Sequence, residues 1–208
     1  LLELRGEWKK NAIVSEGKDG IVFKKFNIDA QISGALESVV ETQTGVVLTI
    51  EEMEALTAID IDLASHKTAH SHPLKLAEAL AEEIFRQIRL RKLSGIILID
   101  YPRAKNLGAR DHFHSEIKRI ALQDDYKLVV HGWTRTGLLE LTKDRLGPSL
   151  RDMFLCKNSV SQFLIEVIAI EACRTLITES DGIANPQLVC SQDLKSALLG
   201  PLRKTFDE

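Results

Sequence analysis

Short apolar runs alternate with amphipathic stretches between residues 45 and 143, and this alternation limits the fold more than any other feature. Five runs have the length and β-branched composition of strands: GVVLTI (45–50), EALTAIDI (54–61), GIILID (95–100), KLVVHGW (127–133) and GLLELTK (137–143). Two helices are expected between them, one from Pro73 to about residue 93 and one from about Arg110 to Leu122. This order predicts an α/β fold in which helices are layered on a mixed, partly parallel sheet.

Smaller elements flank this series. Apolar residues with helical spacing predict a helix over 28–40. After residue 156 the pattern predicts a helix, a short strand and a second helix, at 159–177, 187–190 and 191–199. We therefore expect three segments, namely a partial N-terminal segment, a core and a small C-terminal α+β domain, at residues 1–40, 41–155 and 156–208.

Two aspartates stand at the carboxyl ends of predicted strands. Asp60 follows Ile59, and Asp100 ends GIILID, a run typical of a strand buried on both faces. Ligands bind at this edge of α/β sheets. If the two strands are neighbours, a spacing of about 5 Å brings both carboxylates within reach of one cation. Mg²⁺, which suits phosphate chemistry, is held by one or two carboxylates plus water. The alternative is that each aspartate caps a following turn.

The composition excludes some classes of partner. The net charge of −3, with 27% charged and 44% hydrophobic residues, gives no overall basic field, so any nucleic-acid contact needs a local patch. The sequence has no apolar run of 18 residues and no start resembling a signal peptide. We therefore expect a cytoplasmic protein with no membrane partner.

Residues that commonly bind zinc are present but poorly placed for it. Cys156, Cys173 and Cys190 are too few and too widely spaced for a disulfide framework or a zinc site. His66, His70 and His72 crowd one polar loop, where a metal site is the less favoured interpretation. No zinc is therefore expected.

Basic and aromatic residues suggest nucleic-acid contacts, each with a structural alternative. RQIRLRK (86–92) could bind RNA, or its charges could form salt bridges with Glu82 and Glu83 on one helix. Trp133 and Tyr101 could stack on a base, or they could belong to the hydrophobic core.

Three stretches, EALTAIDI, EEIFRQIRLRKLSGIILIDY and GLLELTKDRLGPSL, resemble in order and spacing the catalytic core of the ribonuclease E/G family. The resemblance covers residues 28–150 well and 159–208 more weakly. It implies a nuclease core of the DNase I-like or RNase H-like kind. It also implies an endoribonuclease of RNA processing or decay that cleaves single-stranded RNA to 5′-phosphate and 3′-hydroxyl ends, using Mg²⁺ or, as a substitute, Mn²⁺.

The resemblance assigns roles to four residues. The family's two catalytic, metal-binding aspartates fall on Asp60 and Asp100. Its auxiliary Asn, two residues after the first aspartate, falls on Asp62. A basic residue that opens the next strand falls on Lys127, which either contacts the RNA backbone or is an ordinary solvated lysine.

This chain also departs from the family pattern. Arg103 stands where the family often has a further acid, and Cys156 stands alone where longer members carry a Cys-Pro-x-Cys zinc linker. The tetramer which that linker supports is therefore not expected, and a homodimer stays open. The chain begins at Leu1, and we expect the family's upstream S1 and 5′-sensing regions to be absent from it. The alternative function is a non-catalytic RNA-binding or interaction module that keeps the nuclease fold.

Overall fold

The computed structural model describes residues 23–63, 73–102, 107–122, 128–156, 163–180 and 182–200. The chain divides into two compact units, which are described separately. The central unit is Ile32–Ser161, and the terminal unit combines Leu1–Gln31 with Gln162–Glu208.

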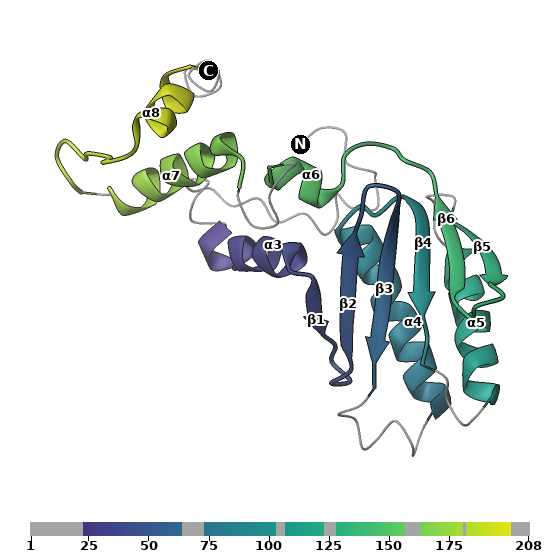
Figure 1. The fold of residues 1–208 in the computed structure, drawn as a ribbon. Coiled ribbons are helices and arrows are strands. Elements are labelled where there is room, and N and C mark those ends of the chain that lie inside the picture. Colours follow the sequence, from purple (N-terminus) through teal and green to yellow (C-terminus); the bar gives the residue numbers. More distant parts are fainter. Residues whose placement is uncertain are drawn as a thin grey trace, which may run out of the picture. The chain divides into compact units, whose positions relative to one another are not determined.

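The central unit is built on a six-stranded sheet with the order β1-β2-β3-β4-β6-β5 (Figure 1). Its strands are β1 (Val39–Glu41), β2 (Val47–Glu52), β3 (Leu56–Asp62), β4 (Gly95–Asp100), β5 (Leu128–Trp133) and β6 (Leu139–Lys143). β3 and β4 run parallel, and the other neighbouring strands are antiparallel. The predicted α/β fold with a mixed sheet is confirmed.

The predicted helix over 28–40 is too long. Helix α3 (Ile28–Leu36) ends four residues earlier, and Val39 and Val40 belong to β1. These two valines pair with Thr49 and Leu48 of β2. The backbone hydrogen bonds of that pairing favour a strand, for which β-branched valines are well suited.

Helices α4 (Pro73–Leu90) and α5 (Leu107–Ala121) lie behind the sheet in Figure 1 and cover one of its faces. Their apolar residues and those of the strands form one hydrophobic core. Its fully buried members include Leu80, Ile84, Phe85, Ile88, Phe113 and Ile117 from the helices and Leu48, Ile59, Ile97, Ile99, Leu139 and Leu141 from the strands. Burial of these side chains supplies the main driving force for the fold.

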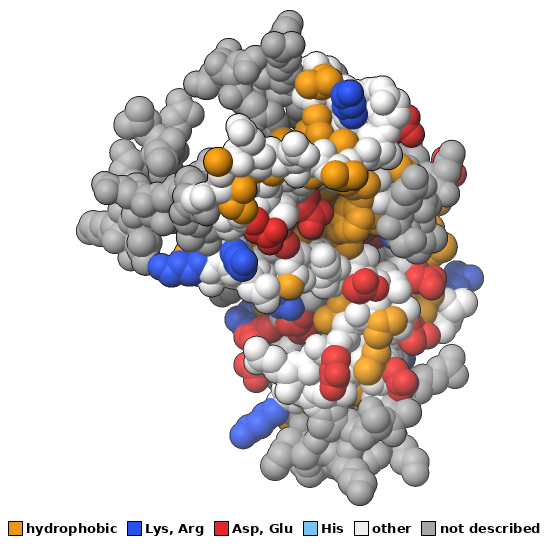
Figure 2. All heavy atoms as spheres, turned by 90° about the vertical axis from the view of Figure 1, so that its left-hand side faces the viewer, with side chains coloured by type: hydrophobic (Ala, Val, Ile, Leu, Met, Phe, Trp, Pro, Cys, Tyr) orange, Lys and Arg blue, Asp and Glu red, His pale blue; other side chains and the backbone are white. Residues whose placement is uncertain are grey.

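The opposite face of the sheet is exposed, so the expectation that GIILID is buried on both faces is wrong. Ile97 and Ile99 are fully buried against the helices, whereas Ile96 is 42% exposed. Side chains alternate between the faces of a strand, and only one face is covered by helices. Figure 2 shows the molecule turned by 90° from the view of Figure 1. Acidic side chains are scattered over its lower half, and the basic side chains drawn in blue do not form a continuous patch.

The basic stretch 86–92 lies at the end of α4, and two of its arginines have structural partners. Arg86 pairs with Glu83 at 2.8 Å, and the buried Arg91 donates from Nε to Oε1 of Gln87 at 2.9 Å. Arg89 is exposed. The salt-bridge interpretation is therefore confirmed for Arg86, whereas Arg91 is held by a hydrogen bond to Gln87 and not by the predicted Glu82 or Glu83.

The terminal unit contains α7 (Ile165–Glu179) and α8 (Gln192–Leu199). Arg174 of α7 pairs with Asp29 at 2.9 Å. The strand expected near 187–190 is not formed, because these residues have no strand partner in the part of the unit that the structure describes. None of the described helices has the length and apolar composition needed to span a membrane.

Candidate functional site

Asp60 and Asp100 lie next to each other on neighbouring parallel strands. They are register partners in the β3–β4 ladder, one step beyond the pair Ile59 and Ile99. The two isoleucines are buried against the helices, whereas both aspartates are exposed on the opposite face. Residues in register on parallel strands direct their side chains to the same face, with backbones about 5 Å apart. The structure therefore gives the juxtaposition that the strand ends predicted.

The two carboxylates are not neutralised by other described residues. Neither Asp60 nor Asp100 makes a hydrogen bond or ion pair with a residue that the structure describes. Two like charges this close repel each other, and a shared cation removes that repulsion. Thr49 of β2 is the register partner of Asp60 on its other side, so this half-buried threonine lies on the same face of the sheet.

The donor set suits a hard cation that keeps part of its water. Among the described residues, no group of three or more His, Cys, Asp or Glu side chains lies close enough together to hold a metal ion. A pair of carboxylates is the usual protein contribution to a Mg²⁺ site, in which water completes the octahedron. A structural zinc site would need four protein ligands of nitrogen or sulfur character.

The other predicted site residues are not part of this pair. Asp62 ends β3 on the same face as Asp60, but its register partner is Val47 of β2, and it makes an interaction of its own. Five further residues named from the sequence lie outside the described residues. They are Lys127, Arg103 and the loop histidines His66, His70 and His72. Their roles therefore stay predictions.

Tyr101 belongs to the hydrophobic core. It is only 3% exposed, and its ring stacks on that of Phe113 with centroids 4.4 Å apart. The base-stacking interpretation is therefore wrong for Tyr101, because Phe113 and the rest of the core cover its ring and leave no face open to a base. Tyr101 directly follows Asp100, so its packing in the core fixes the backbone next to that exposed aspartate.

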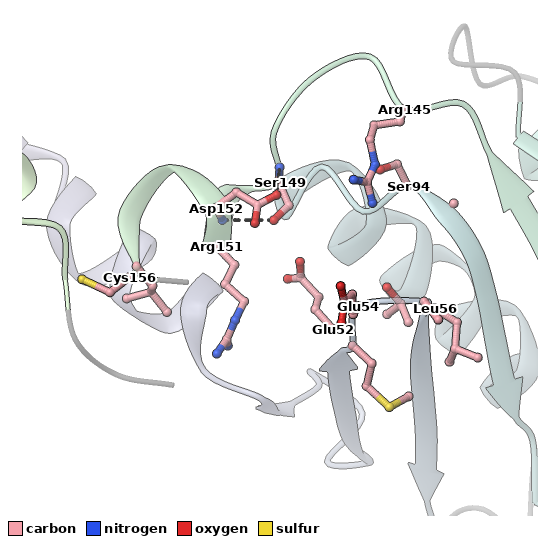
Figure 3. Close-up of a pocket in the computed structure, with 14 residues that line it drawn as sticks. Glu52, Glu54, Leu56, Ser94, Arg145, Ser149, Arg151, Asp152 and Cys156 are labelled. Atoms are coloured by element: carbon pink, nitrogen blue, oxygen red, sulfur yellow. Dashed lines mark hydrogen bonds between the residues drawn. The ribbon is translucent and has the colours of Figure 1, made fainter. Parts of the chain in front are cut away.

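A cavity of about 490 Å³ lies at the other end of β3 and β4 (Figure 3). It is bounded by the β2–β3 turn and by the short helix α6 (Leu150–Phe154). Its charged lining residues have both signs: Glu52, Glu54, Asp152, Arg145 and Arg151. Sequence reasoning did not single out this cavity, because its charged residues come from segments with no common motif.

Ser149 connects α6 to the wall of the cavity. Its Oγ accepts a hydrogen bond from the Asp152 backbone, and Asp152 accepts one from the Ser149 backbone, which together form a capping box. Figure 3 shows the Glu52 side chain between the end of β2 and Ser149. Burial raises the pKa of the Glu52 carboxyl, and this effect outweighs the hydrogen bond from Ser149 and the charges of Arg91 and Arg151.

The raised pKa of Glu52 predicts a pH-dependent effect of Glu52→Gln. The folded chain holds the Glu52 proton more tightly than the unfolded chain, so this group's contribution to stability falls as pH rises through the folded pKa. Gln cannot ionise, so the variant should gain stability relative to wild type as pH rises from 4.5 toward neutrality. Thermal unfolding of both proteins across this range measures the difference. The exposed Glu54→Gln serves as the control, and a difference for Glu52→Gln that does not change with pH would contradict the prediction.

Comparisons of the sequence with known proteins identify a family and several relatives. The model of the ribonuclease E/G family matches residues 3–146, which is more than half of the chain. Ribonuclease G of Escherichia coli is 27% identical over 164 residues, which are 75% of this chain and 34% of the relative. Ribonuclease E of the same organism is 33% identical over 136 residues, 62% of this chain and 12% of the relative. Ribonuclease E of Buchnera aphidicola is 29% identical over 187 residues, 81% of this chain and 20% of the relative.

The matched region includes β3 and β4 and therefore both aspartates. The chain spans about a third of the length of ribonuclease G and a smaller share of ribonuclease E. On the family match, the chain belongs to the ribonuclease E/G family.

Proposed function

We propose that this chain carries the metal-binding aspartates of a Mg²⁺-dependent endoribonuclease. Its substrate is single-stranded RNA, its products carry 5′-phosphate and 3′-hydroxyl ends, and its role is RNA processing or decay. One observation carries the proposal: Asp60 and Asp100 are register partners on an exposed sheet face, within a chain of the ribonuclease E/G family. Curated relatives named ribonuclease G and ribonuclease E support RNA as the substrate.

Asp60 and Asp100 would hold the ion, and the sheet fixes the spacing of their backbones. Mg²⁺ supplies charge stabilisation at the phosphate and lowers the pKa of a bound water. Mn²⁺ should substitute, because it favours the same oxygen ligands. Asp62, exposed two residues farther along the same face, adds negative charge that favours the cation and opposes an unaccompanied phosphate.

The exposed face also explains how a polymer could reach the pair. No described helix covers this side of β3 and β4, and both aspartates are exposed. A single strand of RNA can therefore approach with its backbone, without the chain having to open. A base-paired duplex is wider and stiffer, so it should be the poorer substrate.

Removal of the metal tests the proposal directly. The 208-residue chain should cleave a short fluorescent single-stranded RNA in Mg²⁺, lose this activity in EDTA, and regain it when Mg²⁺ or Mn²⁺ is added in excess. Product ends are identified by ligation of the 5′-phosphate and by enzymatic tailing of the 3′-hydroxyl. The same RNA annealed to its complement is the control substrate.

Two results would contradict the proposal. Cleavage that persists in EDTA and leaves a cyclic 2′,3′-phosphate would show a metal-independent attack by the ribose hydroxyl. Binding of the RNA with no cleavage in any metal would favour the alternative, a non-catalytic RNA-binding module.

A further inference from the structure

A second cavity, of about 370 Å³, lies between the start of α5 and the turn that joins β5 to β6. It is lined by Arg110, Asp111, Trp133, Thr134, Arg135, Thr136 and Gly137. Two arginines, two hydroxyls and an indole thus surround it, together with one carboxylate. In a chain with a net charge of −3, this is a local concentration of basic and aromatic groups.

Arg110 is held in place from two directions. Its guanidinium carbon lies 3.9 Å from the centroid of the Trp133 ring, and its Nη2 donates to the carbonyl of Gly137 at 3.1 Å. The guanidinium is therefore stacked on one side and hydrogen bonded at one end. Arg110 also lines the cavity, and the Gly137 carbonyl is its hydrogen-bond acceptor among the described residues.

The turn that faces Arg110 is stiffened by its own hydrogen bonds. The Thr134 backbone donates to Leu138 at 2.7 Å, and the Gly137 backbone donates to Thr134 at 3.0 Å. The Thr134 hydroxyl also accepts from the Leu138 backbone at 3.0 Å and lies 3.0 Å from the Thr136 hydroxyl. The cavity is therefore formed in advance, which lowers the entropy lost on binding.

The position of Trp133 depends on a bulge. The β5–β6 register shifts between Val130 and Gly132, and a bulge of this kind redirects the side chains that follow it. His114 packs edge-on against the indole, with ring centroids 5.9 Å apart. Burial lowers the pKa of His114, with Lys118 acting in the same direction, so the imidazole favours its neutral form. His114 is therefore a positioning residue for Trp133.

The cavity lies at the same edge of the sheet as the aspartate pair. Trp133 pairs with Leu139, which pairs with Ile99, the residue before Asp100. β5 is two strands from β4, a distance of about 10 Å between backbones. Trp133 packs against the core on the helix-covered face that Leu139 and Ile99 share, whereas Asp100 lies on the opposite face. A strand of RNA that passes around this end of the sheet would therefore meet both places.

We propose that the Arg110–Trp133 cavity is a subsite for single-stranded RNA, which holds a nucleotide close to the one that is cut. Arg110 presents a planar guanidinium on which a base can stack. Arg135, which is exposed at the same cavity, can pair with the phosphate next to that base. The Thr134 and Thr136 side chains offer hydroxyls to the sugar and phosphate. This subsite rests on the proposed function, because RNA is its ligand.

Binding measured without cleavage tests the subsite. The full chain is titrated with a short fluorescent single-stranded RNA in EDTA, and the dissociation constant is read from fluorescence anisotropy. Arg110→Gln should weaken binding about 5- to 20-fold, the size expected when one base loses its stacking partner. Arg110→Lys should weaken it similarly, because it keeps the charge but loses the plane. Arg119→Gln, which removes one exposed arginine from the last turn of the same helix, should change binding by less than about twofold.

Tryptophan fluorescence provides a readout at the cavity itself. Trp8 is the other tryptophan of the chain, so a Trp8→Phe background leaves Trp133 as the reporter. RNA should quench its emission, and Arg110→Gln in the same background should reduce that quenching. Circular dichroism at the temperature of the titration confirms that each variant is folded.

Failure of the subsite and failure of the proposed function can be told apart. Equal weakening by Arg110→Gln and Arg119→Gln, or binding that leaves Trp133 emission unchanged, would overturn the subsite while Mg²⁺-dependent cleavage still stood. Binding that depends on Arg110, in a chain that cleaves no RNA, would support the subsite and refute the nuclease. No binding at all by the wild-type chain would refute the subsite.

Discussion

Asp60→Asn and Asp100→Asn should each lower Mg²⁺-dependent RNA cleavage by about 100- to 1000-fold, the loss typical when one preorganised electrostatic group is removed. Asn keeps the shape of the side chain and removes its negative charge, so the ion loses half of its charged protein ligands. Both aspartates are exposed, and neither makes a hydrogen bond or ion pair with a described residue. Their replacement should therefore change the free energy of unfolding by no more than about 0.5 kcal/mol.

Glu51→Gln is the matched control for this experiment. Glu51 is an exposed acid of β2 on the same sheet face, and it pairs with Ala58, two residues before Asp60. Its replacement removes the same charge without touching the aspartate pair, so cleavage should stay within about twofold of wild type. Asp60→Asn and Asp100→Asn, by contrast, should each regain part of the lost activity at high Mg²⁺.

The double variant distinguishes a shared ion from two independent effects. If Asp60 and Asp100 hold one ion, the combined loss should be close to that of either single variant rather than the product of the two. Single variants that cleave as well as Glu51→Gln would show that the pair does not carry the reaction. A product of two independent losses would show that the carboxylates act separately.

The sequence was enough to predict the aspartate pair because the signal is local. Each strand is marked by a run that ends in Ile followed by Asp, and each run is followed by a stretch of helical periodicity or by a polar loop. Only one further condition was needed, namely that the two strands be neighbours in the sheet. Consecutive strands usually are, and β3 and β4 are joined through α4. β4 ends at Asp100, whereas β3 continues to Asp62, so the register Asp60 to Asp100 is set by the pairing of the two strands and not by their ends.

Two features of the fold could not be predicted because they depend on partners distant in sequence. Val39 and Val40 continue a helical spacing, and only their pairing with β2 makes them a strand. The exposed face of β4 was hidden because Ile96, at 42% exposure, is as apolar as the buried Ile97. Composition does not show which face of such a run is covered.

The Arg110–Trp133 cavity shows a similar limit for function. The sequence offers Trp133 either as a base-stacking residue or as part of the core, but no pattern links it to Arg110, which lies 23 positions earlier. Their stacking requires the start of α5 to pack beside a hairpin whose bulge sets the direction of the indole. Patterns of single residues do not encode such a contact.

Phe113→Ala should lower the free energy of unfolding by about 3–5 kcal/mol, the usual cost of removing a buried aromatic side chain. Phe113 is fully buried in α5, and its ring stacks on Tyr101, the residue that follows Asp100. This loss is a large fraction of a typical domain's total stability. Chemical denaturation gives the value. Leu122→Ala is the control, because Leu122 is 88% exposed at the end of the same helix and its replacement should cost no more than about 0.5 kcal/mol.

The cavity left beside Tyr101 should also loosen the end of β4. At a temperature where the variant is still folded, it should therefore need more Mg²⁺ than wild type for half-maximal cleavage. A loss of less than about 1 kcal/mol would instead mean that the packing behind Asp100 does not hold the strand end in place.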